Sequence, residues 1–570
     1  MVVMDSIDNL ERAKCLHQEG GLEQAILIYK SLVKKDKSLL EAWHLLAMAY
    51  TQSEQYNKAL LALNKVIALA PGEVGFLNSR ANVFIRLDNT LDAIESLNCA
   101  IRIDPGYAIA YNTLGRCYYL QNNLSLAWQN YNKAIELDDC FVEAHYNLAL
   151  LYLKQDKLKD AISELKVVIQ LQPSFYRAHG QLGEAQLNVG DFNSSIVSFL
   201  QRLELQPHHA NTYYSLGVAY FKEAQFSESC LAFEQALSLD CQESDLCHLL
   251  GNAYVELGDP AKALNYYMKQ LEVSPLVECY YNIGVILMHQ DRNKDALTYL
   301  MLAKDLDSNY LPTYINLGSI YLKLNQLDNA TDCYKQAISL DPANEELQHI
   351  LAAISQNNLP DKAPASYIEN LFNQYAIYYD KHLTDVLDFK VPEYLYSAVD
   401  TVLLERESYP DNWFIVDVGC GTGLVAPLFK PLSHRLVGID LSEKMIEVAK
   451  TKDLYDELVV MAAEDIADCY SGVDLIIASD VLSYIGDLVP IFKVFASVIV
   501  SNGLLAFSVE STSSADYILQ TTIRYAHNKS YIESSLEGAG MRMLSCSRHV
   551  IRTQQKQAVY GYVVVAELLV

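Results

Sequence analysis

The sequence predicts an α-solenoid, a stack of paired helices, followed by an α/β domain built on a mostly parallel sheet. Small residues recur every 34 residues from about residue 6 to residue 343. Three glycines spaced two apart follow an apolar run that begins at Trp413, and strand and helix signals alternate from there onward. A chain of 570 residues is also too long for one core, so two or more domains are expected.

The helical repeat is marked by a small residue at one fixed position. Its members are Ala47, Ala81, Gly115, Ala149, Gly183, Gly217 and Gly251, followed by Gly284 and Gly318. One interval is a residue short, between Pro275 and Gly284. A 34-residue period with a small residue where two helices touch is typical of tetratricopeptide repeats. We predict ten repeats from Asp5 to Pro342, the first degenerate, and a capping helix over 343–356.

The other repeat positions agree with this interpretation. Between Glu41 and Pro71 the expected packing positions hold Trp43, Leu46, Ala47, Tyr50, Ala59 and Leu63. Small residues let paired helices approach, and the proline ends the second helix. One aromatic position holds Tyr50, Tyr118, Tyr152, Tyr220, Tyr254 and Tyr321. We expect these tyrosines to be core residues.

The inner groove of such an array is a candidate binding surface for a protein or peptide. Asn147, Asn282 and Asn316 share one repeat position on the face that lines it. A side-chain amide can bond a peptide backbone through both its oxygen and its nitrogen. The arrangement resembles the asparagine ladder in the repeat domain of the O-linked N-acetylglucosamine transferase. The ladder is incomplete, and the alternative is that asparagine is simply common at this position.

The segment between the repeats and the sheet breaks the helical pattern. Residues 357–364 contain two prolines in eight positions, so we interpret them as a linker. The predicted domains are a repeat domain over 1–357, a linker and helical lid over 358–411, and the α/β domain over 412–570.

Composition limits which classes of partner and which cellular compartment are expected. A formal net charge of −27 argues against nucleic acid or an anionic membrane as the main partner. The twelve cysteines form no C-x-x-C pair, which disfavours metal and disulfide roles. No secretion signal and no apolar run long enough for a membrane span are present, so a cytoplasmic location is expected.

The chemistry of the chain centres on Trp413 to Gly423, WFIVDVGCGTG, which reads as a strand, a tight turn and the start of a helix. Glycine adopts backbone angles closed to other residues and lets a ligand lie against the main chain. Free amides at the start of the next helix would face that ligand. The G-x-G-x-G spacing favours a nucleoside with a charged amino-acid tail over a dinucleotide.

A second strand, 435–440, ends in Asp440, seventeen positions after Gly423 and placed to accept hydrogen bonds from ribose hydroxyls. At VDVGCGTG and GIDLSEKMIEVAK the sequence resembles the class I S-adenosylmethionine-dependent methyltransferases. That class has a Rossmann-like sheet of seven strands with an antiparallel terminal hairpin. The strands expected here lie near 413–419, 435–440, 457–463, 473–480, 503–510, 542–551 and 558–568. The last two leave no room for a helix between them.

The resemblance implies S-adenosyl-L-methionine as cofactor and assigns residues to it. Asp417 would lie near the methionine ammonium, and the turn would consist of Gly419, Cys420, Gly421 and Gly423. Asp440 and Leu441 would hold the ribose end. Glu464 and Asp465 stand where a polar residue meets the adenine amino group, and which of the two does so stays open. Ser479 closes the fourth strand beside the transferred methyl.

Residues 365–400 are predicted to be helical and to contribute an aromatic lid. Tyr375 and Tyr379 lie in an F-x-x-Y-A-x-x-Y-D segment that folds over the cofactor in many small-molecule methyltransferases of this class. An aromatic lid excludes water and can face a sulfonium cation. The alternative is that these tyrosines only pack their helix on the sheet.

Two further segments supply candidate catalytic residues, namely 479–487 and 522–527, the latter expected in a loop and helix above the pocket. Both resemble predicted bacterial methyltransferases that contain tetratricopeptide repeats, which share D-V-L-x-Y-x-G-D-L and R-Y-A-H. His527 is the first candidate for a general base because of its titration range, and Asp480 is the second. Tyr484 and Tyr525 would orient the acceptor. A histidine in such a loop is also commonly structural.

The sequence therefore predicts a methyltransferase that acts on a protein or peptide recruited by the repeats. The N-P-P-Y motif of amide or base nitrogen methylation is missing after the fourth strand, as are the paired glutamates of arginine methyltransferases. Two alternatives stay open. One is a small-molecule O- or N-methyltransferase whose repeats serve assembly, and the other is a non-catalytic scaffold that senses the cofactor.

Overall fold

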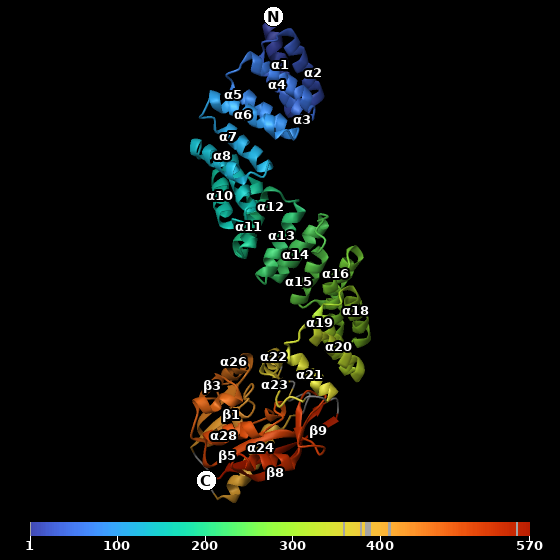
Figure 1. Ribbon diagram of the computed structural model, residues 1–570, viewed down its shortest axis with the longest axis vertical. Helices are drawn as coiled ribbons and strands as arrows, with labels where there is room; N and C mark the ends of the chain where they lie inside the picture. The colour runs from blue at the N-terminus through green and yellow to red at the C-terminus, as the bar shows by residue number, and fades with distance from the viewer. Residues whose placement is uncertain are drawn as a thin grey trace. The chain divides into compact units, whose positions relative to one another are not determined.

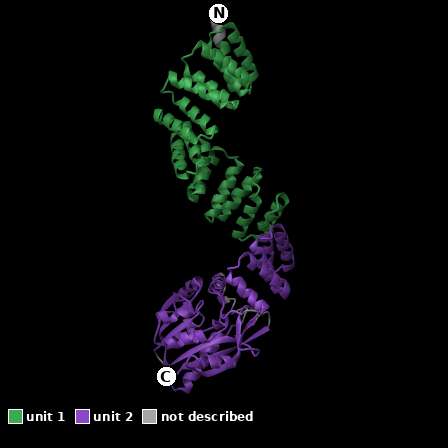
Figure 2. Ribbon diagram, viewed as in Figure 1, with its two compact units in different colours: residues 1–279 green, residues 280–570 purple. Residues whose placement is uncertain are grey.

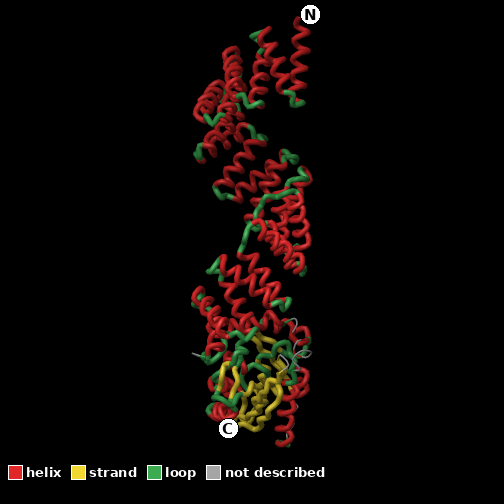
Figure 3. Tube along the Cα trace, turned by 90° about the vertical axis from the view of Figure 1, so that its right-hand side faces the viewer, coloured by secondary structure: helices red, strands yellow, loops and turns green. Residues whose placement is uncertain are grey.

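The computed structural model describes residues 2–356, 359–376, 379–381, 383, 389–407, 412–554 and 557–569 (Figure 1). The chain divides into two compact units, residues 1–279 and 280–570 (Figure 2). The first unit is entirely helical, and the strands all belong to the second (Figure 3). None of the helices in these described segments combines the length and apolar character that a bilayer crossing requires.

Unit 1 consists of paired helices, each odd-numbered helix packing on the even-numbered helix that follows it. The helices are α1 (Val2–Gln18), α2 (Leu22–Lys35), α3 (Leu40–Gln52), α4 (Tyr56–Leu69), α5 (Val74–Arg86), α6 (Thr90–Ile103), α7 (Ala108–Leu120), α8 (Leu124–Leu137), α9 (Val142–Lys154), α10 (Leu158–Leu171), α11 (Tyr176–Asn188), α12 (Phe192–Leu205), α13 (Ala210–Lys222), α14 (Phe226–Ser238), α15 (Leu246–Glu256) and α16 (Pro260–Val273). The next helix, α17 (Val277–His289), begins in unit 1 and continues into unit 2.

The turn inside each repeat uses one residue in the left-handed region, which lets the chain reverse within a few residues. These residues are Gly20, Glu54, Asp88, Asn122, Asp156, Gly190, Ala224, Gly258, Asp291 and Asn325. They recur at 34 residues except for the interval from Gly258 to Asp291, which is one shorter. The described residues thus show the predicted repeat and its short interval. They form ten helix pairs, and the helices that follow α17 are α18 (Asn293–Leu306), α19 (Leu311–Lys323) and α20 (Leu327–Leu340). The predicted cap is α21 (Glu345–Ser355).

The volume of the facing side chain explains whether the small position is glycine or alanine in unit 1. A Cβ atom on Gly217 would lie 2.6 Å from the ring of Phe233, sixteen residues later. The same collision occurs for Gly115, Gly183 and Gly251 against Tyr131, Phe199 and Tyr267. Where the residue sixteen positions later is a leucine, at Leu63, Leu97 and Leu165, the small residue is alanine. A ring in this place leaves no room for a methyl group.

We expect Gly217→Ala to destabilise unit 1 by about 1–3 kcal/mol, because the added methyl overpacks against Phe233. Phe233→Leu, which recreates the alanine–leucine pairing of other repeats, should restore much of that loss in the double variant. Urea denaturation of the full chain, followed by far-ultraviolet circular dichroism, measures both. Equal losses in the single and double variants would contradict the pairing.

Unit 2 adds an α/β domain to the last repeats. The described residues form a sheet of nine strands, two more than the seven predicted. The predicted strands correspond to β1 (Trp413–Val418), β2 (Ser433–Asp440), β3 (Glu457–Val460), β4 (Val473–Ala478), β5 (Ile499–Ser511), β8 (Met541–Gln554) and β9 (Gln557–Leu568), and the two additional strands are β6 (Tyr517–Leu519) and β7 (Tyr525–His527). The order is β3-β2-β1-β4-β5, all parallel, followed by antiparallel β9 and then β8. This confirms the predicted Rossmann-like sheet and its terminal hairpin. The strand order reverses beside β1, where ligands bind in such sheets.

Helices cover the sheet and form a lid segment before it. The lid segment has α22 (Ala365–Tyr375), α23 (Tyr379–Lys381) and α24 (Val391–Glu405). Between the strands lie α25 (Ala426–Phe429), α26 (Glu443–Thr451), α27 (Ile466–Cys469), α28 (Val489–Val498) and α29 (Lys529–Glu537). The core between these layers includes Val416, Val437, Ile476, Phe492 and Phe507, all fully buried.

The segment 522–527 differs from the prediction of a loop and helix. It belongs to a short hairpin of β6 (Tyr517–Leu519) and β7 (Tyr525–His527), and β7 pairs in parallel with the end of β5. Strand β5 runs on to Ser511, so its end offers backbone groups for β7 to pair with. Strands of three residues are too short to give a period in the sequence.

Helix α21, which follows the last repeat, packs against this hairpin. The final repeats and the sheet therefore belong to one compact unit. Ala352 and Ala353 of α21 form one apolar cluster with Leu519 and Tyr525. The Nε2 atom of Gln356, just after α21, donates to the Leu519 carbonyl oxygen at 2.7 Å. The array and the sheet therefore share a continuous buried contact in unit 2.

Candidate active site

A cavity opens at the carboxyl ends of β1, β2, β3 and β4. Its empty space, part of which is open to solvent, is about 910 Å³. Its walls are Lys362, Ala363, Ala365, Ile368, Phe372, Tyr379, Gly419, Gly421, Asp440, Leu441, Met461, Ala462, Ala463, Glu464, Ser479, Asp480, Val481, Tyr484 and Ile485. The lid segment and four strand ends thus contribute to one site.

The glycine turn forms one wall of the cavity. Gly419, Gly421 and Gly423 all have positive φ, at 63°, 54° and 88°, where glycine is the favoured residue. A Cβ atom on Gly419 would collide with Val481. On Gly421 it would meet, among the described residues, only Tyr379 at 3.7 Å, so the backbone there is open to the cavity. The turn can therefore lie directly against a ligand.

Asp440 closes β2 and is fixed at the edge of the cavity by the backbone. Its Oδ2 accepts from the Gly421 amide at 2.9 Å, and its Oδ1 accepts from the Ser442 amide at 2.8 Å. Burial raises the pKa of Asp440, and these amides act in the opposite direction. Leu441 beside it also lines the cavity. Each carboxylate oxygen keeps a further lone pair for a hydroxyl donor.

An apolar slot with one acidic end lies beyond Asp440. Met461, Ala462 and Ala463 form its wall, and Glu464 stands at the end. The Nζ atom of Lys362 pairs with Oε1 of Glu464 at 2.9 Å. Asp465 is exposed and does not line the cavity. Of the two acids that the sequence left open, the structure brings Glu464 to the site.

Three predicted cofactor residues, Asp417 before the turn and Cys420 and Gly423 within it, do not line the cavity. Asp417 is fully buried, and its Oδ2 accepts from the Tyr455 hydroxyl at 2.6 Å. Its Oδ1 has no hydrogen-bond partner within the described segments. Cys420 is buried, and Gly423 lies so close to Tyr455 that a Cβ atom would be 2.9 Å from the ring. These residues support the conformation of the turn without lining the cavity.

We expect Asp417→Asn to stabilise the protein at neutral pH. Burial raises the pKa of Asp417 from 3.8 to about 7. The folded state thus holds this proton more tightly, so the contribution of Asp417 to stability is full below about pH 4 and is lost as pH rises to about 7. Asparagine keeps an acceptor for Tyr455 but does not ionise. The difference in unfolding free energy between variant and wild type should grow from pH 4 to pH 7 and then stay constant. A difference that does not change with pH would contradict this.

The lid segment is tied to the turn by polar contacts that the sequence prediction missed. Oδ1 of Asn373 accepts from Ser442 Oγ at 2.7 Å. Asp380 accepts from the Thr422 hydroxyl and pairs with Lys452 at 2.5 Å. Asn373 and Asp380 both lie in the segment that was predicted as a lid from its aromatic residues. Their polar side chains next to these aromatics were the sequence feature that could have indicated the contacts.

The aromatic part of the lid also reaches the cavity. Tyr379 lines it, and burial raises its pKa. Phe372 stacks edge-on against Tyr379, with ring centres 5.9 Å apart, and against Tyr484 at 5.7 Å. Tyr375 ends α22, and its side chain lies outside the described part of the structure. Ser479, at the end of β4, lines the cavity as well.

The four predicted catalytic residues separate into two pairs. Asp480 and Tyr484 line the cavity, whereas His527 and Tyr525 do not. Nε2 of His527 lies 2.9 and 3.0 Å from the carbonyl oxygens of Ile485 and Gly486, and burial lowers its pKa to about 4. The Tyr525 hydroxyl donates to the Pro360 carbonyl oxygen at 2.6 Å. Both side chains are fully buried and hold the backbone in place, so we replace their predicted roles as base and acceptor contact with structural ones.

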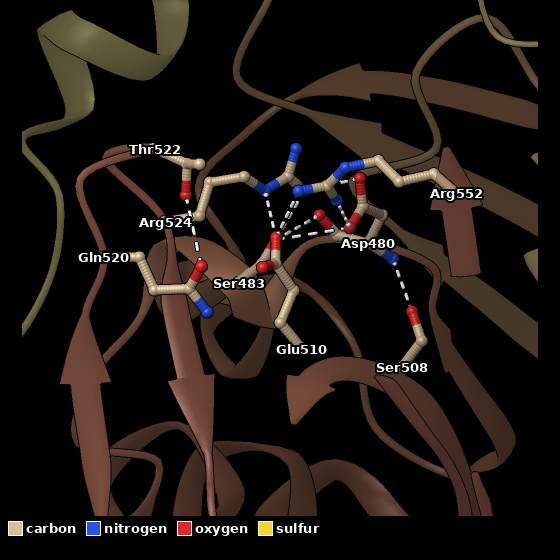
Figure 4. Close-up of polar contacts among 8 residues, drawn as sticks. All are labelled: Asp480, Ser483, Ser508, Glu510, Gln520, Thr522, Arg524 and Arg552. Carbon is tan, nitrogen blue, oxygen red and sulfur yellow. Dashed lines mark hydrogen bonds and ion pairs between the residues drawn. The ribbon is translucent and has the colours of Figure 1, made fainter. Parts of the chain in front are cut away.

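Asp480 belongs to a buried cluster of four charges (Figure 4). Arg524 pairs with Asp480 at 2.5 Å and with Glu510 at 3.0 Å. Arg552 pairs with Glu510 and lies 3.7 Å from Asp480. The Arg524 guanidinium also lies 4.8 Å from the Tyr484 ring centre. Both oxygens of Asp480 face a guanidinium, so Asp480 is not free to act as a base.

The sheet order, the glycine turn and the carboxylate after β2 define a class I methyltransferase domain, preceded in this chain by tetratricopeptide repeats. Residues 416–507 match the family described as Methyltransferase domain. Residues 40–73, 142–175, 210–241, 244–275, 277–310 and 312–344 match families described as Tetratricopeptide repeat, and 115–156 match one described as TPR repeat.

Individual relatives cover each half separately. Over 18% of the chain, it is 29% identical to the ubiquinone biosynthesis O-methyltransferase of Thiobacillus denitrificans and to the putative methyltransferase YqeM of Bacillus subtilis, covering 47% and 45% of those proteins. A UDP-N-acetylglucosamine–peptide N-acetylglucosaminyltransferase of Giardia intestinalis is 26% identical over 19% of the chain and 8% of that protein. The chain spans less than half the length of these three relatives. Among solved structures, the TPR protein YrrB is 21% identical, with a TM-score of 0.30 over 33% of this chain and 96% of its own.

Proposed function

We propose that the protein is an S-adenosyl-L-methionine-dependent methyltransferase. The observation that carries this is Asp440, fixed by the Gly421 amide between an open glycine turn and an apolar slot. A carboxylate there suits ribose hydroxyls, and the slot ending in Glu464 suits an adenine ring. Asp417 precedes the turn and does not line the cavity, so its predicted place near the methionine ammonium stays a prediction. The cofactor would supply a methyl group on an electrophilic sulfonium.

The residues of the chain would align the acceptor and exclude water. Methyl transfer is an in-line displacement, so orientation contributes much of the rate. Asn373 bonds Ser442 before α26 and Asp380 bonds Thr422 in the turn, and the lid segment places Phe372 and Tyr379 on the cavity. Aromatic faces attract a cation and keep water away from it. Asp480 and Tyr484 form the wall where we place the acceptor.

The preferred acceptor is a protein or peptide recruited by the repeats, and we retain residues 1–357, 358–411 and 412–570 as the working division into repeats, lid and catalytic domain. In unit 1, Nδ2 of Asn147 donates to Asn112 at 2.9 Å. In unit 2, Nδ2 of Asn316 donates to the Tyr281 hydroxyl at 3.0 Å. These bonds orient the amides, whose oxygens would accept from a peptide backbone, and Asn282 occupies the equivalent position.

A small-molecule acceptor is the second candidate. It is favoured by the likeness to ubiquinone biosynthesis O-methyltransferases, one of which, from Mesorhizobium japonicum, is 36% identical over 13% of the chain. The repeats would then serve assembly. In that case the cavity alone would determine which acceptor is used.

Labelling of a cell extract distinguishes these functions. The full chain is incubated with extract and tritiated S-adenosylmethionine, and acid precipitation separates proteins from small molecules. Label in the precipitate that requires the full chain supports the preferred function, and label confined to the supernatant supports the second. Binding of S-adenosylhomocysteine without transfer of label to either fraction would contradict both and indicate a scaffold.

A further inference from the structure

The helix that closes the repeat array contacts the lid segment, which lines the cavity, and the β6–β7 hairpin, which does not. On one side, His349 of α21 lies 5.8 Å from Tyr367 of α22, measured between ring centres, and Glu346 is hydrogen-bonded to Asn370. Helix α22 carries Ile368 and Phe372 on the cavity wall. On the other side, His349 lies 6.0 Å from the ring of Tyr525 in β7. Helix α21 therefore lies between the lid and the β6–β7 hairpin.

Burial of the His349 ring at this junction destabilises the folded state. It is 2% exposed, and neither ring nitrogen has a hydrogen-bond partner in the described structure. Burial lowers its pKa to about 4. A buried polar group without a partner destabilises the folded state. The packing of α21 against both neighbours is strong enough to retain it.

The hairpin that α21 holds is strained beside its only arginine. Ile523 has φ of 64°, an outlier for a β-branched residue, which persists only where surrounding structure imposes it. Its amide donates to the Gln520 carbonyl oxygen, and the Gln520 amide donates to the Arg524 carbonyl oxygen, both at 2.8 Å. The Ile523 side chain packs on the cluster that contains Ile350 and Ile354 of α21. Contacts with the array thus hold the residue that precedes Arg524.

Arg524 connects the β6–β7 hairpin to the cavity wall where we place the acceptor. Its Nη2 donates to Ser483 Oγ at 2.7 Å, and it pairs with Asp480 at 2.5 Å. Asp480 is itself in the left-handed region, with φ of 61°. The guanidinium covers Tyr484, so two cavity residues depend on one arginine. That arginine reaches them from a hairpin anchored on the repeats.

We propose that Arg524 is a positioning residue of the methyl-transfer site, and that α21 sets its position through the β6–β7 hairpin. Helix α21 then supports the acceptor wall, and a partner that shifts α21 would change the rate of transfer. This inference rests on the proposed function for its catalytic part. Its structural part can be tested separately.

The catalytic part is tested with Arg524→Gln and Arg524→Lys in the full chain, with Arg542→Gln as control. Arg542 pairs with Glu567 on the terminal hairpin, and its side chain is 62% exposed. We expect Arg524→Gln to lower methyl incorporation about tenfold or more while S-adenosylhomocysteine affinity stays within about threefold, and lysine to recover part of the loss. Arg542→Gln should change neither. Equal loss of affinity and transfer would mean that Arg524 only supports the fold and would overturn the positioning role.

The structural part is tested by amide hydrogen exchange in Ala353→Met and Ala303→Met. Both alanines are fully buried in the array, but Ala303 of α18 is outside the cluster that contacts the hairpin. We expect Ala353→Met to speed exchange at 480–485 and 519–525 about threefold or more, and Ala303→Met to leave both segments unchanged. Unchanged exchange in Ala353→Met, or equal effects of both variants, would overturn the coupling. A wild-type chain that binds no S-adenosylhomocysteine would refute the proposed function, and the exchange result would still decide the coupling.

Discussion

Asp440→Ala is expected to abolish measurable S-adenosylhomocysteine binding at micromolar concentrations. Without the carboxylate, the ribose hydroxyls would lose the acceptor of two charge-assisted hydrogen bonds. These bonds together correspond to about 3 kcal/mol, or roughly a hundredfold in affinity. The Gly421 amide would also lose its acceptor, so the turn itself would be less well held. Isothermal calorimetry with the full chain measures the change.

The matched control is Asp468→Ala, which removes an exposed carboxylate from α27 in the same domain. It should bind as the wild type does. Thermal unfolding of both variants separates loss of the ligand contact from loss of the fold. Retained affinity in Asp440→Ala would show that the cavity does not hold a nucleoside in the manner proposed.

The repeats and the cofactor turn were predictable because their determinants are close in sequence. A helix pair meets its own partner sixteen residues away, as Gly217 meets Phe233, so the pattern recurs with a visible period. The turn after β1 and Asp440 after β2 likewise belong to one strand-helix-strand unit. Local determinants of this kind predicted the helical repeat, the strands of the α/β domain and its terminal hairpin.

Asp480 and Tyr484 of the acceptor wall were predicted, but the charge cluster behind them was not, because its residues meet only through the register of the sheet. Glu510 lies beside Ala526 of β7 and opposite Gly561 of β9, which brings Arg524 and Arg552 to one place from distant segments. The sequence gives no spacing for such a meeting. His527 shows the other limit, since its titration range favoured a base while its complete burial on the Ile485 and Gly486 carbonyls makes it structural.

The largest effect on stability is expected at Glu510, where Glu510→Leu should destabilise the α/β domain by about 3–5 kcal/mol. Glu510 is 1% exposed and pairs with both Arg524 and Arg552, so its removal leaves two positive charges against Asp480 alone. An uncompensated buried charge costs far more than a lost contact. Urea denaturation of the full chain, with S-adenosylhomocysteine absent, measures the loss.

The double variant Glu510→Leu with Arg552→Met decides whether charge balance is the cause. It removes one carboxylate and one guanidinium and leaves Arg524 paired with Asp480 at the cavity. Replacing a buried ion pair by apolar side chains of similar volume is often neutral, so the double variant should be more stable than Glu510→Leu. It should also retain transfer activity if Arg524 alone positions Asp480 and Tyr484. A double variant less stable than the single one would mean that the cluster acts through its hydrogen-bond geometry and not through its balance of charge.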